Sequence, residues 1–226
     1  MNEKEKWEEL KKYRNEAISI KMGGYFSNSV RTDIKHISFT LSRYKFISKL
    51  LLYRKNIEVL ELGCNEALGA LLLLQNNDIK SYKGVDFDAE SIAWNQENMP
   101  EKCKFVCGDF FEPSNVEGMF DLIFSLDVIE HINQEREEEF GNIFSSHLKA
   151  GGVAVIGTPN ITMYQYESEG SREGHVNMYS QERIHELLCR WFDNVFIFNM
   201  NDEVVNDCFA PMSCYIFAVC TGKKRG

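Results

Sequence analysis

Short apolar runs alternate with helix-like stretches from residue 57 onward. The apolar runs predict strands at residues 57–62, 82–87, 104–110, 120–126 and 152–158. The stretches EALGALLLLQ, AESIAWNQEN and QEREEEFGNIFSSHL, which lie between strands, are predicted to be helices. Strands that alternate with helices pair in parallel through right-handed crossovers. The pattern therefore predicts an α/β fold with a doubly wound, mostly parallel sheet covered by helices on both faces.

The first 56 residues predict helices and no strand. One apolar stripe at helical spacing consists of Trp7, Leu10, Tyr13 and Ala17. A second stripe runs through residues 34–51, and the Gly-, Ser- and Asn-rich segment 21–31 between the stripes is predicted to be a loop. We expect residues 1–56 to form a helical cap or lid that belongs to the same domain as residues 57–226.

The chain beyond the fifth strand predicts a long loop, a helix and two further strands. Residues 158–178 are polar, and loops of this length often cover or bind a ligand. A helix is expected from the N-cap residue Ser180 to Trp191. Two β-rich runs, at 193–200 and 213–220, are joined by a linker able to reverse the chain. They predict an antiparallel pair at the end of a seven-stranded sheet.

Composition narrows the possible partners. The net charge of −9 disfavours a nucleic-acid partner, because such binding depends on Lys and Arg neutralising phosphates. The seven cysteines include no C-x-x-C pair, so we expect free thiols in a reducing cytoplasm and no metal site. The charged N-terminus does not resemble a signal peptide, and no apolar run could span a membrane. These features predict a cytoplasmic protein, with a homodimer left open.

Three predicted strands end in acidic residues, at the sheet edge where open α/β sheets bind ligands. Glu61 precedes a tight turn at Gly63, but the glycine spacing of a dinucleotide site fails at Asn65 and Leu68. This failure disfavours NAD. Asp86, at the end of the second strand, is placed to accept the hydroxyls of a ribose. At the end of the third strand, Asp109 could accept from an exocyclic amine while Phe110 faces a base.

Five motifs carry a resemblance to a known family. They are VLELGCNEALGA, GVDFDAESIAWNQEN, CGDFF, FDLIFSLDVIEHI and LKAGGVAVIGTPN. In order and spacing they resemble the motifs of class I S-adenosylmethionine-dependent methyltransferases over residues 57–160, and more loosely to the C-terminus. The resemblance implies a Rossmann-like sheet with an antiparallel last strand and S-adenosyl-L-methionine as cofactor. The sequence departs from the family at Asn65 and Ala67, where glycines are common.

The resemblance also implies a set of cofactor-binding residues. It consists of Glu61, Gly63, Cys64, Asp86, Phe87, Asp109, Phe110, Ser125 and Leu126. Glu61 and Gly63 would border the methionine part, and Ser125 and Leu126 would lie near the sulfonium. From the N-terminal segment, Tyr25 and Arg31 are further candidates that would fold over the cofactor, with Arg31 pairing with the methionine carboxylate.

The candidate catalytic residues lie just after the fourth strand and near the end of the long loop. A hydroxyl acceptor needs a base to take its proton. His131 and His175 are the candidate bases, although His131 could instead cap its helix and His175 could be an ordinary exposed loop residue. Candidate substrate contacts are Asp127, Glu130 and Asn201. The family's amine-methylating segment, Asn/Asp-Pro-Pro-Tyr, is replaced by Ser-Leu-Asp-Val at 125–128, which disfavours N-methylation of bases or glutamine.

The acceptor is expected to be a small molecule. The C-terminal region is similar to methyltransferases of bacterial surface-polysaccharide gene clusters, some of which modify sugars or phosphoramidate groups. We therefore expect O-methylation of a sugar, a nucleotide-linked sugar or a phosphoramidate group. Two alternatives stay open: an RNA or protein methyltransferase, which the acidic charge disfavours, and a non-catalytic cofactor-binding partner subunit, which the altered glycine loop allows.

Overall fold

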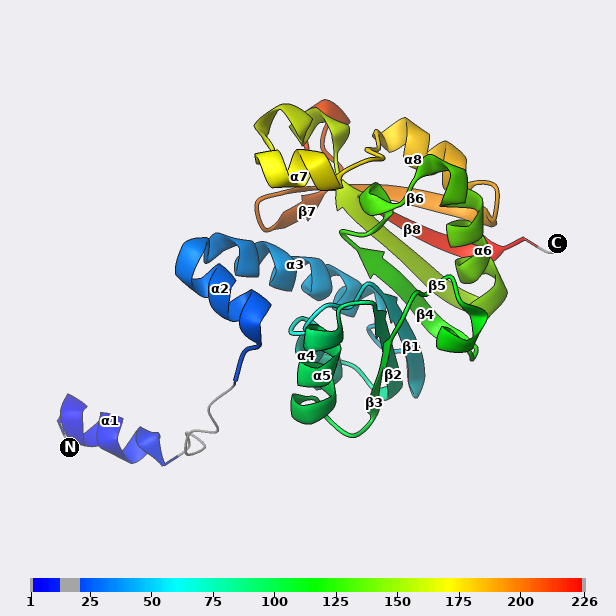
Figure 1. Cartoon of the computed structure of the whole chain (residues 1–226). Helices are drawn as coiled ribbons and strands as arrows, with labels where there is room; N and C mark the ends of the chain where they lie inside the picture. Colours follow the sequence, from blue (N-terminus) through cyan, green and yellow to red (C-terminus); the bar gives the residue numbers. More distant parts are fainter. Residues whose placement is uncertain (1, 13–20, 225–226) are drawn as a thin grey trace.

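A computed structural model describes residues 2–12 and 21–224, and it contains one mixed sheet in the order β3-β2-β1-β4-β5-β8-β6-β7 (Figure 1). The strands are β1 (Ile57–Leu62), β2 (Ile79–Asp86), β3 (Cys103–Cys107), β4 (Phe120–Leu126), β5 (Leu148–Pro159), β6 (Phe192–Asn201), β7 (Val204–Asn206) and β8 (Tyr215–Lys223). Strands β1 to β5 pair in parallel, as predicted. The last strand, β8, runs antiparallel to both β5 and β6.

Helices cover both faces of the sheet. They are α1 (Glu3–Lys11), α2 (Gly24–Thr32), α3 (Lys35–Leu50), α4 (Ala70–Asn76), α5 (Ala89–Asn98), α6 (Glu137–His147), α7 (Glu169–Gly174) and α8 (Gln181–Leu188). Alternate residues of β4 pack into different cores. Ile123 packs with α6 and α8, whereas Leu122 and Phe124 pack with α3 and α4. This alternation makes the sheet doubly wound, as the sequence predicted.

Three predictions about the elements were wrong in detail. The sheet has eight strands because the linker expected only to reverse the chain contains β7, which pairs with β6. Residues 24–31 of the predicted loop belong to α2, because Glu66 from a distant turn caps this helix in place of a local side chain. The stretch 158–178 also contains a 3-10 segment, η4 (Ile161–Tyr166), and helix α7.

The N-terminal helices differ in how they pack. Tyr44, Ile47 and Leu51 of the α3 region are buried against the sheet, so this helix is part of the core. Helix α1 buries none of its residues. Two members of the predicted first apolar stripe, Tyr13 and Ala17, lie outside the described residues. Across the helices that are described, none combines the length and apolar character needed to cross a bilayer.

Candidate functional site

A cavity of about 420 Å³ lies at the carboxyl ends of β1, β2 and β4. Strand order reverses between β1 and β4, and this is where open α/β sheets place their ligands. Side chains from α2 and α3, including Tyr25 and Arg43, complete its wall. The topology thus brings together loops that are far apart in the sequence.

The turn after β1 has an unusual backbone. Gly63, Asn65 and Ala67 all have positive φ, at 75°, 43° and 46°. A side chain at Gly63 would also meet Val128, because its Cβ would lie 2.2 Å from the Val128 Cγ2 atom. Asn65 and Ala67 therefore adopt the left-handed conformation that glycine adopts most readily.

Glu61 lies at the base of the cavity and is 1% exposed. The hydroxyl groups of Tyr44 and Tyr82 each donate a hydrogen bond to one of its carboxylate oxygens. Burial raises the pKa of Glu61 to about 8, against the opposing effect of the two tyrosine hydrogen bonds. The neighbouring Cys64 thiol is buried and lines the same cavity.

Asp86 connects two of the loops around the cavity. One of its oxygens accepts from the Asn65 amide at 2.8 Å, and the other accepts from the Asp88 amide at 2.9 Å. Each carboxylate oxygen keeps capacity for another hydrogen bond. The adjacent Phe87 side chain borders the cavity and is 81% exposed, so its ring leaves an apolar face uncovered.

Helix α2 is attached to the cavity by Glu66. The two carboxylate oxygens of Glu66 accept from the Tyr25 amide at 2.6 Å and the Phe26 amide at 3.0 Å. A carboxylate at a helix N-terminus satisfies free amides and interacts favourably with the helix dipole. This contact holds Tyr25 in the cavity wall, whereas Arg31 is exposed on α2 and does not line the cavity.

A second cavity, of about 440 Å³, adjoins the first, and Arg43 lines both. The Arg43 guanidinium forms an ion pair with Asp127, and its central carbon lies 3.9 Å from the centre of the Tyr215 ring. Asp127 has a φ of 56°, in the left-handed region. The Arg43–Asp127 pair therefore marks the junction between the two cavities.

The two candidate histidines meet at this junction. His131 lines the first cavity and His175 lines the second, and their ring centres are 4.9 Å apart. Glu130 is fully buried beside them and accepts from the Thr158 hydroxyl at 2.9 Å. Burial, and then the charge of Asp127, raise the pKa of Glu130 above its ordinary value.

The other predicted residues divide into those that line a cavity and those that do not. Phe110 and Leu126 line the first cavity. Asp109 is exposed and accepts from the Phe111 amide, and the Ser125 hydroxyl donates to the Leu62 carbonyl inside the sheet. Asn201 accepts from the Cys214 amide and so holds the loop between β6 and β8. Among the described residues, these last three are not in the walls of either cavity.

Three residues at the site have functions that no pattern along the sequence indicates. Arg43 lies in a helix whose apolar stripe predicts only packing, and Tyr215 lies in the last strand. Glu66 was placed in a predicted helix but not assigned a role. Each acts through a contact with a segment distant in sequence, and spacing along the chain carries no signal for such contacts.

Comparisons with known proteins identify the family. A family model described as a methyltransferase domain matches residues 36–190, which is more than half of the chain. The chain belongs to the methyltransferase domain family. It is a class I S-adenosylmethionine-dependent methyltransferase, as the five motifs predicted. A comparison with curated proteins gives no match.

Solved structures share the fold of this methyltransferase. A methyltransferase of Clostridium acetobutylicum has a TM-score of 0.65 at 15% identity, covering 88% of this chain and 96% of its own. A chain from the complex of the Haloferax volcanii Trm112 activator with a methyltransferase has a TM-score of 0.69 at 13% identity, covering 89% and 97%. The N-methyltransferase NodS of Bradyrhizobium japonicum, in complex with S-adenosylhomocysteine, has a TM-score of 0.61 at 16% identity, covering 81% and 86%.

The first cavity of the methyltransferase fits its cofactor. The uncovered Phe87 ring offers an apolar surface to a base, and the remaining acceptor capacity of Asp86 suits the two hydroxyls of a ribose. The cavity volume of about 420 Å³ lies within the range of small-molecule sites. Glu61 and Gly63, the two residues predicted for the methionine part, lie in its wall together with Cys64, which was predicted to bind the cofactor.

Proposed function

We propose that this methyltransferase methylates a hydroxyl group of a small, polar acceptor bound in the second cavity. The observation that carries the proposal is the junction at Arg43, where the second cavity adjoins the cofactor cavity. When bound, S-adenosylmethionine supplies an electrophilic methyl group. Placing the acceptor next to it contributes through proximity and orientation, which can lower a barrier by roughly 7–11 kcal/mol.

The cofactor would be held by residues of the first cavity. Asp86 would accept from the ribose hydroxyls, and Phe87 would lie beside the adenine. Tyr25, on the helix anchored by Glu66, would cover the site and exclude water. The buried Arg43 guanidinium, fixed by Asp127, would orient groups at the junction.

Two histidines would promote loss of the acceptor proton. His131 and His175 enter the junction from the two cavities, and each uses its Nδ1 atom in a hydrogen bond with a neighbouring group. Their arrangement therefore leaves the Nε2 atoms available toward an acceptor. Proton removal by a positioned side chain typically raises the reaction rate about 10²–10⁴-fold.

The lining of the second cavity favours a sugar-like acceptor. Tyr215 and Phe39 provide ring surfaces, and Lys35, Glu167 and Asp202 provide charged groups able to bind hydroxyls or a linked phosphate. We propose a sugar, a nucleotide-linked sugar or a phosphoramidate group of a bacterial surface polysaccharide as the acceptor class. The acidic net charge is a reason to place RNA second.

A transfer assay tests this function. The purified protein is incubated with methyl-labelled S-adenosylmethionine and, separately, nucleotide sugars, total RNA or denatured protein. We expect label in a nucleotide sugar, with an O-methyl ether identified by NMR. His175→Asn should lower turnover by about 10²-fold without changing cofactor affinity in calorimetry, whereas His185→Asn, on the exposed face of α8, should leave both unchanged. Label confined to RNA or protein, or no label in any pool, contradicts the proposal.

A further inference from the structure

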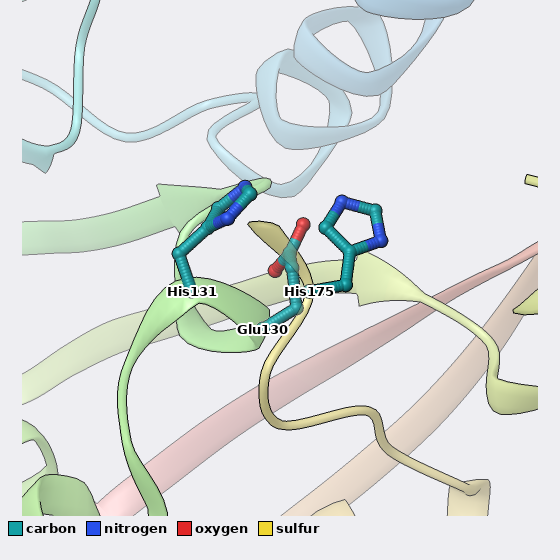
Figure 2. A group of neighbouring side chains, drawn as sticks. All are labelled: Glu130, His131 and His175. Atoms are coloured by element: carbon teal, nitrogen blue, oxygen red, sulfur yellow. The ribbon is translucent and has the colours of Figure 1, made fainter. Parts of the chain in front are cut away.

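Three side chains at the junction form a group with the composition of a metal site. Glu130 and His131 belong to the 3-10 turn η2 (Ile129–His131) after β4, and His175 follows α7. One nitrogen or oxygen atom from each residue lies within 4.8 Å of the others. Figure 2 shows the Glu130 carboxylate between the two imidazole rings. Two imidazoles and one carboxylate, with other positions open, form a common ligand set for divalent transition metals.

The hydrogen bonds of the two histidines orient their rings. His131 Nδ1 lies 2.8 Å from the Gly174 carbonyl oxygen, and His175 Nδ1 lies 2.8 Å from a Glu167 carboxylate oxygen. A carbonyl or a carboxylate only accepts, so each Nδ1 carries the proton and donates it. In a neutral ring Nε2 then has a free lone pair. Metal-binding histidines characteristically donate their other ring N–H to a carbonyl or carboxylate in this way.

A buried oxygen atom of Glu130 that has no hydrogen-bond partner within the described part of the chain is an independent reason to expect a cation here. Its side chain is fully buried; one oxygen accepts from the Thr158 hydroxyl, and the other, Oε1, has no hydrogen-bond partner among the described residues. A buried polar atom without a partner is unfavourable, and more so if it is charged. Arg43 is the nearby cation, but its guanidinium pairs with Asp127 and donates no hydrogen bond to Oε1. A bound cation would satisfy the Oε1 atom.

We propose that Glu130, His131 and His175 bind a divalent transition-metal ion. With the ion bound, the two Nε2 atoms would be its ligands, so the histidines would assist loss of the acceptor proton through the ion and not as bases. The ion would take the acceptor hydroxyl as a further ligand and lower the pKa of that hydroxyl, whose proton would pass to solvent. None of the cysteines among the described residues belongs to this group. The proposed ion site rests only on the positions and hydrogen bonds of these side chains, whereas the role of the ion toward the acceptor rests on the proposed function.

Manganese binding tests the site without any transfer assay. The full chain, freed of metals with a chelator, is titrated with MnCl₂ while electron paramagnetic resonance follows the signal of free Mn²⁺. We expect one ion per chain. Loss of a ligand, as in Glu130→Gln or His131→Asn, should weaken the affinity by about 100-fold or more, and loss of the supporting carboxylate, as in Glu167→Gln, by about 10-fold. His185→Asn is the matched control and should bind as the unaltered protein does.

Thermal melting checks that each variant is folded. His131 is exposed, so His131→Asn should fold even if the buried substitution Glu130→Gln does not. Mn²⁺ should raise the melting temperature of the unaltered protein and of His185→Asn, but not that of His131→Asn. No bound ion, or equal binding by all variants, overturns the site. If Mn²⁺ binds as expected and the transfer assay gives no methylated sugar, the ion site stands and the proposed acceptor class is wrong.

Discussion

At the scale of single residues, the cavity is shaped by side chains and backbone angles that are unfavourable in isolation. Ala67 has a positive φ, which costs a non-glycine residue roughly 1–2 kcal/mol. Glu61 is a buried carboxyl group whose charge would be poorly solvated. Tertiary contacts compensate both: the Ala67 methyl is buried in the core, and two tyrosine hydroxyls bind Glu61.

Glu61 makes the stability of the fold depend on pH. Its pKa in the folded protein, about 8, lies above its ordinary value of 4.5, so the folded state holds the proton more tightly. The resulting stabilisation is complete below about pH 4.5 and is lost as the pH rises through 8. Glu61→Gln, which cannot ionise, should remove this loss, with a change in slope of at most about 1.4 kcal/mol per pH unit.

Urea unfolding at several pH values between 5 and 8 measures the effect. The control is Glu58→Gln in the same strand. Lys149 and Lys80 lower the pKa of Glu58 to about 2, so this residue stays ionised across the window and its loss should shift the curve without changing its slope. Parallel curves for the unaltered protein and Glu61→Gln would show that Glu61 is ionised in the fold.

At the scale of elements, the sheet and its crossovers were predicted correctly because their signal is local. Alternating apolar runs such as 57–62 and 120–126 appear as β1 and β4 with the same bounds. Helix α2 was missed because its N-cap residue is Gly23, which offers no side chain, and the capping carboxylate comes from Glu66. Strand β7 was missed because it is short and exists through pairing with β6.

Removal of the Glu66 carboxylate should loosen α2 alone. In Glu66→Ala the Tyr25 and Phe26 amides lose their acceptors, and loss of a cap costs about 0.5–2 kcal/mol. Hydrogen exchange of the α2 amides should therefore accelerate roughly 2- to 30-fold, while α5 keeps its rates. Asp88→Ala gives the reciprocal control, since Asp88 caps α5. Unchanged exchange in α2 would mean that other contacts hold this helix.

At the scale of the whole molecule, the residues of the first cavity were easier to predict from the sequence than those of the second cavity. Asp86 and Phe87 lie where parallel strands end, so their convergence follows from topology. His131 and His175 were each predicted as a candidate, but their contact depends on the path of the 158–178 stretch. The second cavity depends on Arg43 and Tyr215, from opposite ends of the chain, and no pattern along the sequence relates them.

The proposed function requires that the cofactor cavity opens toward the second cavity at the junction marked by Arg43 and Asp127. A crystal structure of the protein with S-adenosylhomocysteine measures this most directly. We expect the ribose at Asp86, the adenine beside Phe87, and the sulfur atom facing the junction and His131. An adenosyl group bound elsewhere, or a sulfur atom separated from the second cavity by protein side chains, would contradict the proposed function.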